Sequence, residues 1–269
     1  MPAAASAGSA PRRKRFGQHF LHDPAVIARI VRALDVRPGD HLVEIGPGRG
    51  ALTGALLGCR PATLDAIEID RDLAARLRAR FAGMPGWTLY ASDALEFDFS
   101  ALAHAHGAQL RIVGNLPYNI STPLLFRLLA HSAALADLTV MLQREVVARL
   151  AARPGARDYG RLTVMLAPHA EVHWLFDVGP GAFQPPPKVW SAVVRVSMRT
   201  PPLFEVSPHY AALVAAAFAQ RRKTLRNAVS QLLTREQISA CGIDPGVRPE
   251  TLTPQAFNTL AQALDRAAR

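Results

Sequence analysis

The stretch that decides the fold is residues 41–50, HLVEIGPGRG, in which an apolar run passes directly into three closely spaced glycines. A short apolar run before a glycine-rich turn is typical of a buried strand, and the residues after the turn predict a helix. Further strands are expected at residues 62–67, 87–90, 110–113, 138–142, 172–176 and 192–196. Because helical segments alternate with the first five strands, the sequence predicts an α/β fold with a mainly parallel sheet covered on both faces.

Polar or glycine residues follow four of these strands. They are Gly46, Glu68, Asp93 and Asn115. In an open parallel sheet, ligands bind beyond the carboxyl ends of the strands. The sequence therefore predicts that these four residues share one binding cleft.

The glycine loop alone does not identify the ligand. Gly46 and Gly48 let the backbone approach a ligand closely, but the spacing suits a dinucleotide, S-adenosylmethionine or a tight turn without any ligand. An acid at position 68 would accept the ribose hydroxyls of either cofactor. Glu44 favours S-adenosylmethionine, because it would face a sulfonium and an ammonium, whereas it would repel a pyrophosphate. Asp93 is placed to accept from an adenine amino group, or else forms an ordinary Asp turn.

Residues 115–118, NLPY, predict the chemistry. The exocyclic amine of adenine is a poor nucleophile because its lone pair is delocalised into the ring. Two acceptors, the Asn115 amide oxygen and the Leu116 carbonyl, would draw that lone pair back onto nitrogen, and Pro117 would fix the direction of the carbonyl. Tyr118 offers a flat face for a flipped base, worth roughly 1–3 kcal/mol. The alternative is a proline turn without function.

Composition restricts the class of protein. The chain has 269 residues, a net charge of +10 and a pI near 10.7, which favour a polyanionic partner such as nucleic acid over a merely basic protein. Its two cysteines, Cys59 and Cys241, lie far apart, which argues against a disulfide scaffold or a zinc site and fits the cytoplasm. We expect no metal. No run approaches the ~20 apolar residues of a membrane span, and we expect no signal sequence.

The chain divides by composition into three parts. Residues 1–11 predict a disordered tail, residues 12–202 a catalytic domain that binds the cofactor, and residues 203–269 a small helical domain that docks on RNA. Helices are expected at 208–233, 235–241 and 254–267. The helix expected at 208–233 contains a basic run, which consists of Arg221, Arg222, Lys223 and Arg226. We interpret this run as a contact for RNA phosphates rather than as a merely solvated helix face. The basic run at residues 12–15 is interpreted in the same way.

Read together, several segments make the chain resemble the bacterial small-subunit (16S) ribosomal RNA adenine dimethyltransferases over residues 12–269. The segments are 14–21 (KRFGQHFL), 43–48 (VEIGPG), 68–70 (EID), 93–94 (DA), 114–123 (GNLPYNISTP), 159–162 (YGRL), 183–191 (FQPPPKVWS) and 220–227 (QRRKTLRN).

The resemblance implies a Rossmann-like class I methyltransferase domain that uses S-adenosylmethionine. It implies two methyl transfers to each of two adjacent adenines near the 3′ end of the RNA, within an immature small subunit, by a cytoplasmic monomer. It implies that Phe183 faces Tyr118 across the target base, and it implies cofactor contacts from His19, Leu21, Gly46, Glu68, Asp93 and Asn115. Position 19 departs from the family, which more often has Asn there, so the cofactor contact could use either the backbone carbonyl or the ring of His19.

Three other functions stay open on the sequence. A large-subunit rRNA adenine methyltransferase of the macrolide-resistance type shares the glycine loop and an Asn-x-Pro-Tyr motif, but not the long agreement through residues 119–123. A DNA adenine methyltransferase would need a DNA-recognition domain, which the sequence does not suggest. A non-catalytic ribosome-assembly factor would not need Glu68, Asp93 and Asn115 together.

Overall fold

A seven-stranded sheet forms the centre of the computed structural model, which describes residues 19–220 and 222–267. Its strands follow the order β4 (Trp87–Tyr90), β3 (Thr63–Ile67), β2 (His41–Ile45), β5 (Leu110–Asn115), β6 (Leu135–Gln143), β9 (Ser191–Met198) and β7 (Ala170–Val178). The strands from β4 to β6 are parallel, and β9 is antiparallel to both of its neighbours. All seven predicted strands are confirmed. The predicted tail at 1–11, the basic run at 12–15 and Arg221 lie outside the described residues.

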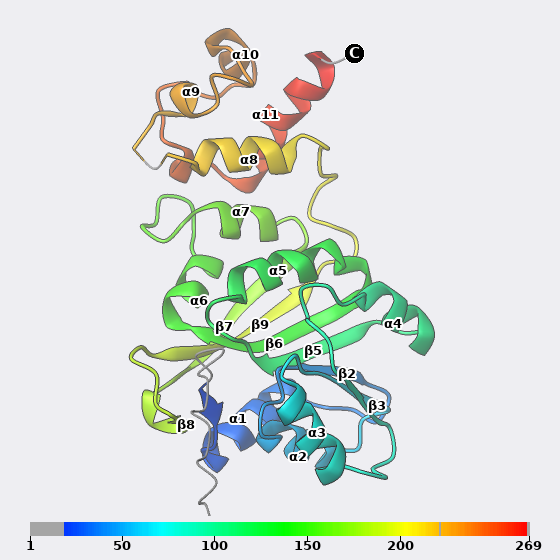
Figure 1. Ribbon diagram of the computed structural model, residues 1–269. Helices are drawn as coiled ribbons and strands as arrows, with labels where there is room; N and C mark the ends of the chain where they lie inside the picture. The colour runs from blue at the N-terminus through cyan, green and yellow to red at the C-terminus, as the bar shows by residue number, and fades with distance from the viewer. Residues whose placement is uncertain (1–18, 221, 268–269) are drawn as a thin grey trace, which may run out of the picture.

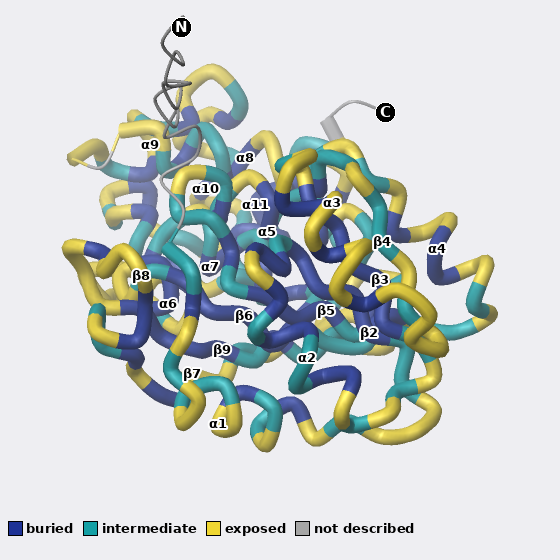
Figure 2. The backbone as a smooth tube through the Cα atoms, turned by 60° about the horizontal axis from the view of Figure 1, so that its bottom comes forward, coloured by how far each residue is buried: buried dark blue, intermediate teal, exposed yellow. Residues whose placement is uncertain are grey.

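Helices cover both faces of the sheet, as the alternation of elements predicted (Figure 1). One face carries α1 (Pro24–Leu34), α2 (Ala51–Gly58) and α3 (Arg71–Arg80), whose apolar side chains share one core with the sheet. The other carries α4 (Phe99–His106), α5 (Ser121–Ala130) and α6 (Arg144–Leu150), which share a second core. The central strands are therefore buried on both sides (Figure 2).

The C-terminal part is helical and lies beyond α7 (Arg161–Leu166) (Figure 1). It contains α8 (Tyr210–Phe218), α9 (Leu225–Ala228), α10 (Arg235–Ala240) and α11 (Pro254–Ala267). Tyr159 and Val164 also belong to the hydrophobic core of this part. The Tyr159 hydroxyl donates to the Leu252 carbonyl at 2.8 Å, and the Tyr210 hydroxyl donates to the Val164 carbonyl at 2.9 Å. The boundary at residue 202 stays a prediction, while these contacts join residues 159–164 to the helical part.

The single helix expected at 208–233 is wrong. Helix α8 ends at Phe218 and α9 begins at Leu225, with turns between them. The amide of Leu225 donates to the Val247 carbonyl at 2.8 Å, and that of Arg226 donates to the Pro245 carbonyl at 3.1 Å. Tertiary hydrogen bonds and burial of Leu225 thus break the helix that local propensity favours. No helix within residues 19–220 and 222–267 combines the length and apolarity that crossing a membrane requires.

A two-stranded antiparallel ribbon lies beside the main sheet. Strand β1 (Phe20–Leu21) pairs with β8 (Phe183–Gln184), so that Leu21 stands opposite Phe183. This pairing joins segments more than 160 positions apart in the sequence. It brings the N-terminal segment to the carboxyl ends of β2 and β5.

Candidate active site

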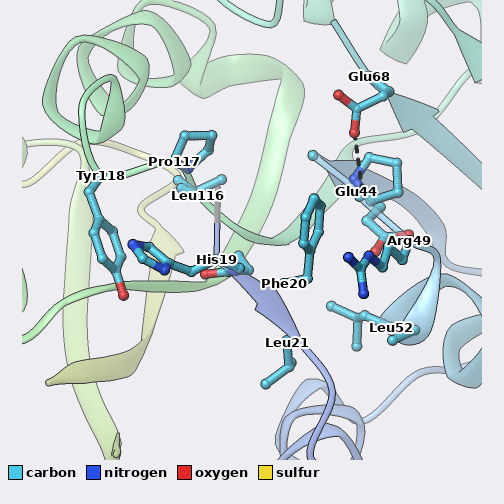
Figure 3. A pocket seen from close by; sticks show the side chains of 15 residues that line it. His19, Phe20, Leu21, Glu44, Arg49, Leu52, Glu68, Leu116, Pro117 and Tyr118 are labelled. Atoms are coloured by element: carbon cyan, nitrogen blue, oxygen red, sulfur yellow. Dashed lines mark hydrogen bonds between the residues drawn. The ribbon is translucent and has the colours of Figure 1, made fainter. Parts of the chain in front are cut away.

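One pocket lies where the strand ends meet. The carboxyl ends of β2, β3 and β5 open into it, and strand β1 forms another side (Figure 3). Its empty space, including the part open to solvent, is about 710 Å³. The side chains and backbone that line it come from His19, Phe20, Leu21, Glu44, Gly46, Pro47, Gly48, Arg49, Ala51, Leu52, Glu68, Asn115, Leu116, Pro117 and Tyr118.

Two glycines allow the pocket wall to form. Gly48 has a φ of +58°, and a Cβ there would lie 2.9 Å from the Phe20 ring. Gly114, one residue before Asn115, has no room for a side chain, because a Cβ would lie 2.4 Å from the Ile45 carbonyl oxygen. Any larger residue at either position would push apart segments that carry pocket residues. The glycine loop and the end of β5 are therefore held close to each other.

Glu68 is a buried carboxylate tied to the glycine loop. It is 3% exposed, and its Oε2 accepts from the Gly48 amide at 3.1 Å (Figure 3). Its Oε1 accepts from the Asp70 amide at 3.0 Å. Burial raises the pKa of Glu68, and the two amide hydrogen bonds oppose that rise. The carboxylate is thus fixed in position at the pocket with further lone pairs to accept hydroxyl donors.

Glu44 is the second buried carboxylate in the pocket. It is 2% exposed and accepts a hydrogen bond from the Thr53 hydroxyl at 2.6 Å. Burial raises the pKa of Glu44 to about 7, and the Thr53 hydrogen bond only partly offsets it. Neither Glu44 nor Glu68 forms an ion pair with another described residue. Two buried acids without a cationic partner are suited to a positively charged, hydroxyl-bearing ligand.

Asn115 is oriented by the N-terminal segment. Its Nδ2 donates to the His19 carbonyl at 2.8 Å, which fixes the direction of the amide. Among the described residues, no side chain or backbone group donates to its Oδ1 or to the Leu116 carbonyl. The backbone around them is held, because the Leu116 amide donates to Met141 at 3.1 Å and Pro117 accepts from Ile120 at 3.2 Å. Two acceptors of adjoining residues therefore remain available at the pocket.

Tyr118 lies at the edge of the pocket, and its hydroxyl forms a hydrogen bond. The hydroxyl lies 2.6 Å from Ser191 Oγ, and burial raises its pKa. The ring facing Tyr118 is that of His19, with 5.7 Å between centroids, and His19 Nδ1 lies 2.7 Å from the Pro185 carbonyl oxygen (Figure 3). Phe183 is 2% exposed in a core and does not line the pocket. Its stacking role stays a prediction, and it would require Phe183 to leave that core.

Asp93 also lies apart from the pocket lining. Its Oδ1 accepts from the Leu95 amide at 2.9 Å, so the carboxylate forms the Asp turn that the sequence allowed. Its contact with a cofactor adenine stays a prediction. Of the seven predicted cofactor residues, the pocket brings together His19, Leu21, Gly46, Gly48, Glu68 and Asn115.

Sequence reasoning missed Phe20 and Arg49. The Phe20 ring packs on Gly48, and the Arg49 guanidinium lies 4.6 Å from the centre of that ring. Phe20 stands between two residues that were predicted to bind cofactor, but nothing in the sequence showed that residues 20–21 form a strand beside the glycine loop. The pairing of β1 with β8 supplies that information.

Of the described residues of the basic run, one lies on a helix as predicted and two do not. Arg222 and Lys223 occupy the turn between α8 and α9, and Arg226 lies on α9. All three are exposed. Their contact with RNA phosphates stays a prediction. Within residues 19–220 and 222–267, His, Cys, Asp and Glu side chains form no group of three that could hold a metal ion.

Comparisons with solved structures agree with the fold. The dimethyladenosine transferase from Plasmodium falciparum superposes with a TM-score of 0.77 at 23% identity, over 93% of this chain and 98% of that one. The 23S rRNA methyltransferase ErmE superposes with a TM-score of 0.67 at 29% identity, over 91% of this chain and 99% of that one.

Relatives of similar sequence identify the family of this chain. The ribosomal RNA small subunit methyltransferase A of Pseudomonas aeruginosa is 53% identical, over 94% of both chains. The protein of the same name from Nitrosococcus oceani is 54% identical, over 93% of this chain and 95% of that one. The profile of the ribosomal RNA adenine dimethylase family matches residues 10–266. With the profile covering almost the whole length and relatives above half identity, the chain belongs to the ribosomal RNA adenine dimethylase family.

Proposed function

We propose that the protein transfers methyl groups from S-adenosylmethionine to N6 of two adjacent adenines near the 3′ end of small-subunit ribosomal RNA, two to each adenine. The observation that carries this is the pair of acceptors at Asn115 and Leu116, placed beside a pocket with two buried acids. Small-subunit rRNA is preferred over large-subunit rRNA because the small-subunit relatives exceed 50% identity, whereas ErmE is 29% identical.

The pocket residues fit S-adenosylmethionine. Glu68 would hold the ribose hydroxyls, and Glu44 would face the ammonium and sulfonium end, where a cation stabilises the ionised carboxylate. The glycine loop at Gly46 and Gly48 would lie against the cofactor backbone. When bound, S-adenosylmethionine supplies a methyl group on a positively charged sulfur, from which an amine nitrogen can take it.

The protein's own contribution is to position and polarise the adenine amine. Asn115 Oδ1 and the Leu116 carbonyl accept from its two hydrogens, which localises the nitrogen lone pair for attack. The hydrogen bond from Asn115 Nδ2 to His19 keeps the amide from rotating, so the oxygen and not the nitrogen faces the amine. No general base is needed, because the nitrogen loses its proton after the methyl transfer. A singly methylated amine keeps one hydrogen, so one acceptor still orients it for the second transfer.

Tyr118 supplies the face on which the flipped adenine stacks. Burial raises the pKa of Tyr118 and keeps its hydroxyl neutral, and the contact with Ser191 fixes the ring. The His19 ring faces Tyr118 at 5.7 Å, and it would have to move for an adenine to enter between them, or else border the base at its edge. The protein would act as a cytoplasmic monomer on an immature small subunit, with exposed Arg222, Lys223 and Arg226 on RNA phosphates.

The deciding experiment measures methyl transfer from labelled S-adenosylmethionine to immature small subunits, free small-subunit rRNA, large-subunit rRNA and DNA. We expect label in the small subunits, recovered as N6,N6-dimethyladenine, and none with the Asn115→Ala variant. Label in large-subunit rRNA or in DNA would replace the proposal with one of those activities. Binding to subunits without any transfer would favour an assembly factor that does not catalyse.

A further inference from the structure

Two tryptophans of the described residues are exposed: Trp174 on β7, and Trp190 directly before β9. Trp174 is 37% exposed and Trp190 is 55% exposed, and Val189 beside it is 44% exposed. These are three of the six large hydrophobic side chains that are exposed in the described residues. Large apolar side chains that gather at one exposed place mark an interaction site. We call Trp174, Val189 and Trp190 the tryptophan patch.

One residue of the patch is next in the chain to a residue that contacts Tyr118. Trp190 directly precedes Ser191, whose Oγ lies 2.6 Å from the Tyr118 hydroxyl. Ser191 starts β9 opposite Gln143 at the end of β6 and Val178 at the end of β7. These strand ends lie on the same edge of the sheet as the end of β5, which carries Asn115. Trp190 is therefore the chain neighbour of the residue that contacts Tyr118.

The Trp174 ring is fixed by a hydrogen bond, and the Trp190 ring lies over the backbone of Gly179. The Trp174 indole N–H donates to Asp177 Oδ1 at 2.9 Å, and a Cβ on Gly179 would lie 3.7 Å from the Trp190 ring. Arg144 connects the two tryptophans, because its amide donates to the Trp190 carbonyl at 2.9 Å and its guanidinium lies 5.4 Å from the Trp174 ring centre. Because its indole N–H is already hydrogen-bonded, Trp174 can contact a ligand only through the surface of its ring. A ring surface stacks on any base without reading its sequence.

Two cations lie at the patch, one of them paired with Asp177. Arg144 donates from Nε to Asp177 at 3.0 Å, and its side chain is still 57% exposed. Lys188 is exposed two residues before Trp190. In a chain with a net charge of +10, cations next to exposed rings match the alternating bases and phosphates of an unpaired strand.

We propose that the tryptophan patch binds the unpaired nucleotide next to the target adenine, with its base on Trp190 and its phosphate near Arg144. Flipping one adenine into the pocket removes the stacking partner of its neighbour, and the patch replaces that partner. The proposal rests on the proposed function, since it assumes that an adenine in RNA occupies the Tyr118 pocket.

The test has two independent measurements. The first is tryptophan fluorescence of the full-length protein during titration with a short single-stranded oligoadenylate. We expect quenching that persists in Trp87→Phe, because Trp87 packs in a core against Phe81, and that weakens in Trp190→Ala. The second is methyl transfer to immature small subunits. There, Trp190→Ala should raise KM about tenfold, the loss of one base stack, with the single-turnover rate at saturating subunit nearly unchanged.

Matched variants separate stacking from other roles. Trp190→Phe keeps a flat ring and should behave nearly as wild type, whereas Trp190→Leu keeps an apolar side chain without a ring face and should behave like Trp190→Ala. Binding of S-adenosylhomocysteine should be equal in all of them, which shows that the pocket is intact. If Trp190→Leu keeps the wild-type KM, the patch contacts a ribosomal protein and the proposal is wrong. Equal quenching and KM in wild type and Trp190→Ala would also overturn it. Quenching in a wild-type protein that transfers no methyl group would contradict the proposed function and leave the patch as an RNA site.

Discussion

Removing the Glu68 carboxylate tests the cofactor site most directly. Glu68 is 3% exposed, and its two oxygens are oriented by the Gly48 and Asp70 amides at 3.1 and 3.0 Å. A ribose held there would gain hydrogen bonds to a preoriented anion. Hydrogen bonds to charged groups contribute about 1.5–3 kcal/mol each, so Glu68→Ala should weaken cofactor binding by roughly tenfold to a hundredfold.

The ribose is common to S-adenosylmethionine and its demethylated product S-adenosylhomocysteine. Glu68→Ala should therefore weaken both to the same extent, measured by calorimetric titration of each ligand. Asp72→Ala is the matched control, because Asp72 is an exposed acid at the start of α3 and its loss changes the net charge equally without touching the pocket. Thermal unfolding of both variants would show that the fold is retained.

Two results would refute the reasoning. If Glu68→Ala binds S-adenosylhomocysteine within about twofold of wild type, the carboxylate does not hold the ribose. If only S-adenosylmethionine is weakened, Glu68 acts on the sulfonium and the orientation of the cofactor is reversed. Tight binding of NAD by the wild-type protein would contradict the cofactor class itself.

Three further predictions concern the acceptor, the second acid and the basic turn. Asn115→Ala should lower single-turnover methyl transfer by roughly 10²–10³-fold, as loss of one preorganised dipole does, and a near-normal rate would contradict the acceptor role. Burial raises the pKa of Glu44 to about 7, so below that pH the free protein holds a proton there that a cationic ligand must displace. Affinity for S-adenosylmethionine should therefore rise with pH from about 6 to about 8. Calorimetry in buffers of different ionisation enthalpy would count the protons released on binding. Affinity that does not change with pH would contradict a protonated Glu44 in the free protein. Neutralising Arg221, Arg222 and Lys223 together should flatten the salt dependence of subunit binding by up to ~0.9 log units per lost phosphate contact, while parallel salt plots would mean that these cations only face solvent.

The strands and their ends were predictable because the information is local. The mainly apolar residues 42–45 are buried on both faces in the centre of a covered sheet, and the glycines after them permit a turn that few other residues allow. Parallel order then places Gly46, Glu68 and Asn115 at one edge without further assumptions, since β3, β2 and β5 are neighbours. Of the predicted residues that line the pocket, Gly46, Gly48, Glu68 and Asn115 lie at these strand ends or directly after them.

What the sequence could not supply depends on contacts between distant segments. The burial of Phe183 is one example: pairing of β8 with β1 places its ring in a hydrophobic core, and its role beside the target base stays a prediction. The same pairing brings His19 to Asn115, where its carbonyl, rather than its side chain, orients the Asn115 amide. Every residue type has that carbonyl, so a change from Asn to His at position 19 preserves this contact. The departure from the family pattern is therefore compatible with an intact acceptor, and its effect falls on the ring that faces Tyr118.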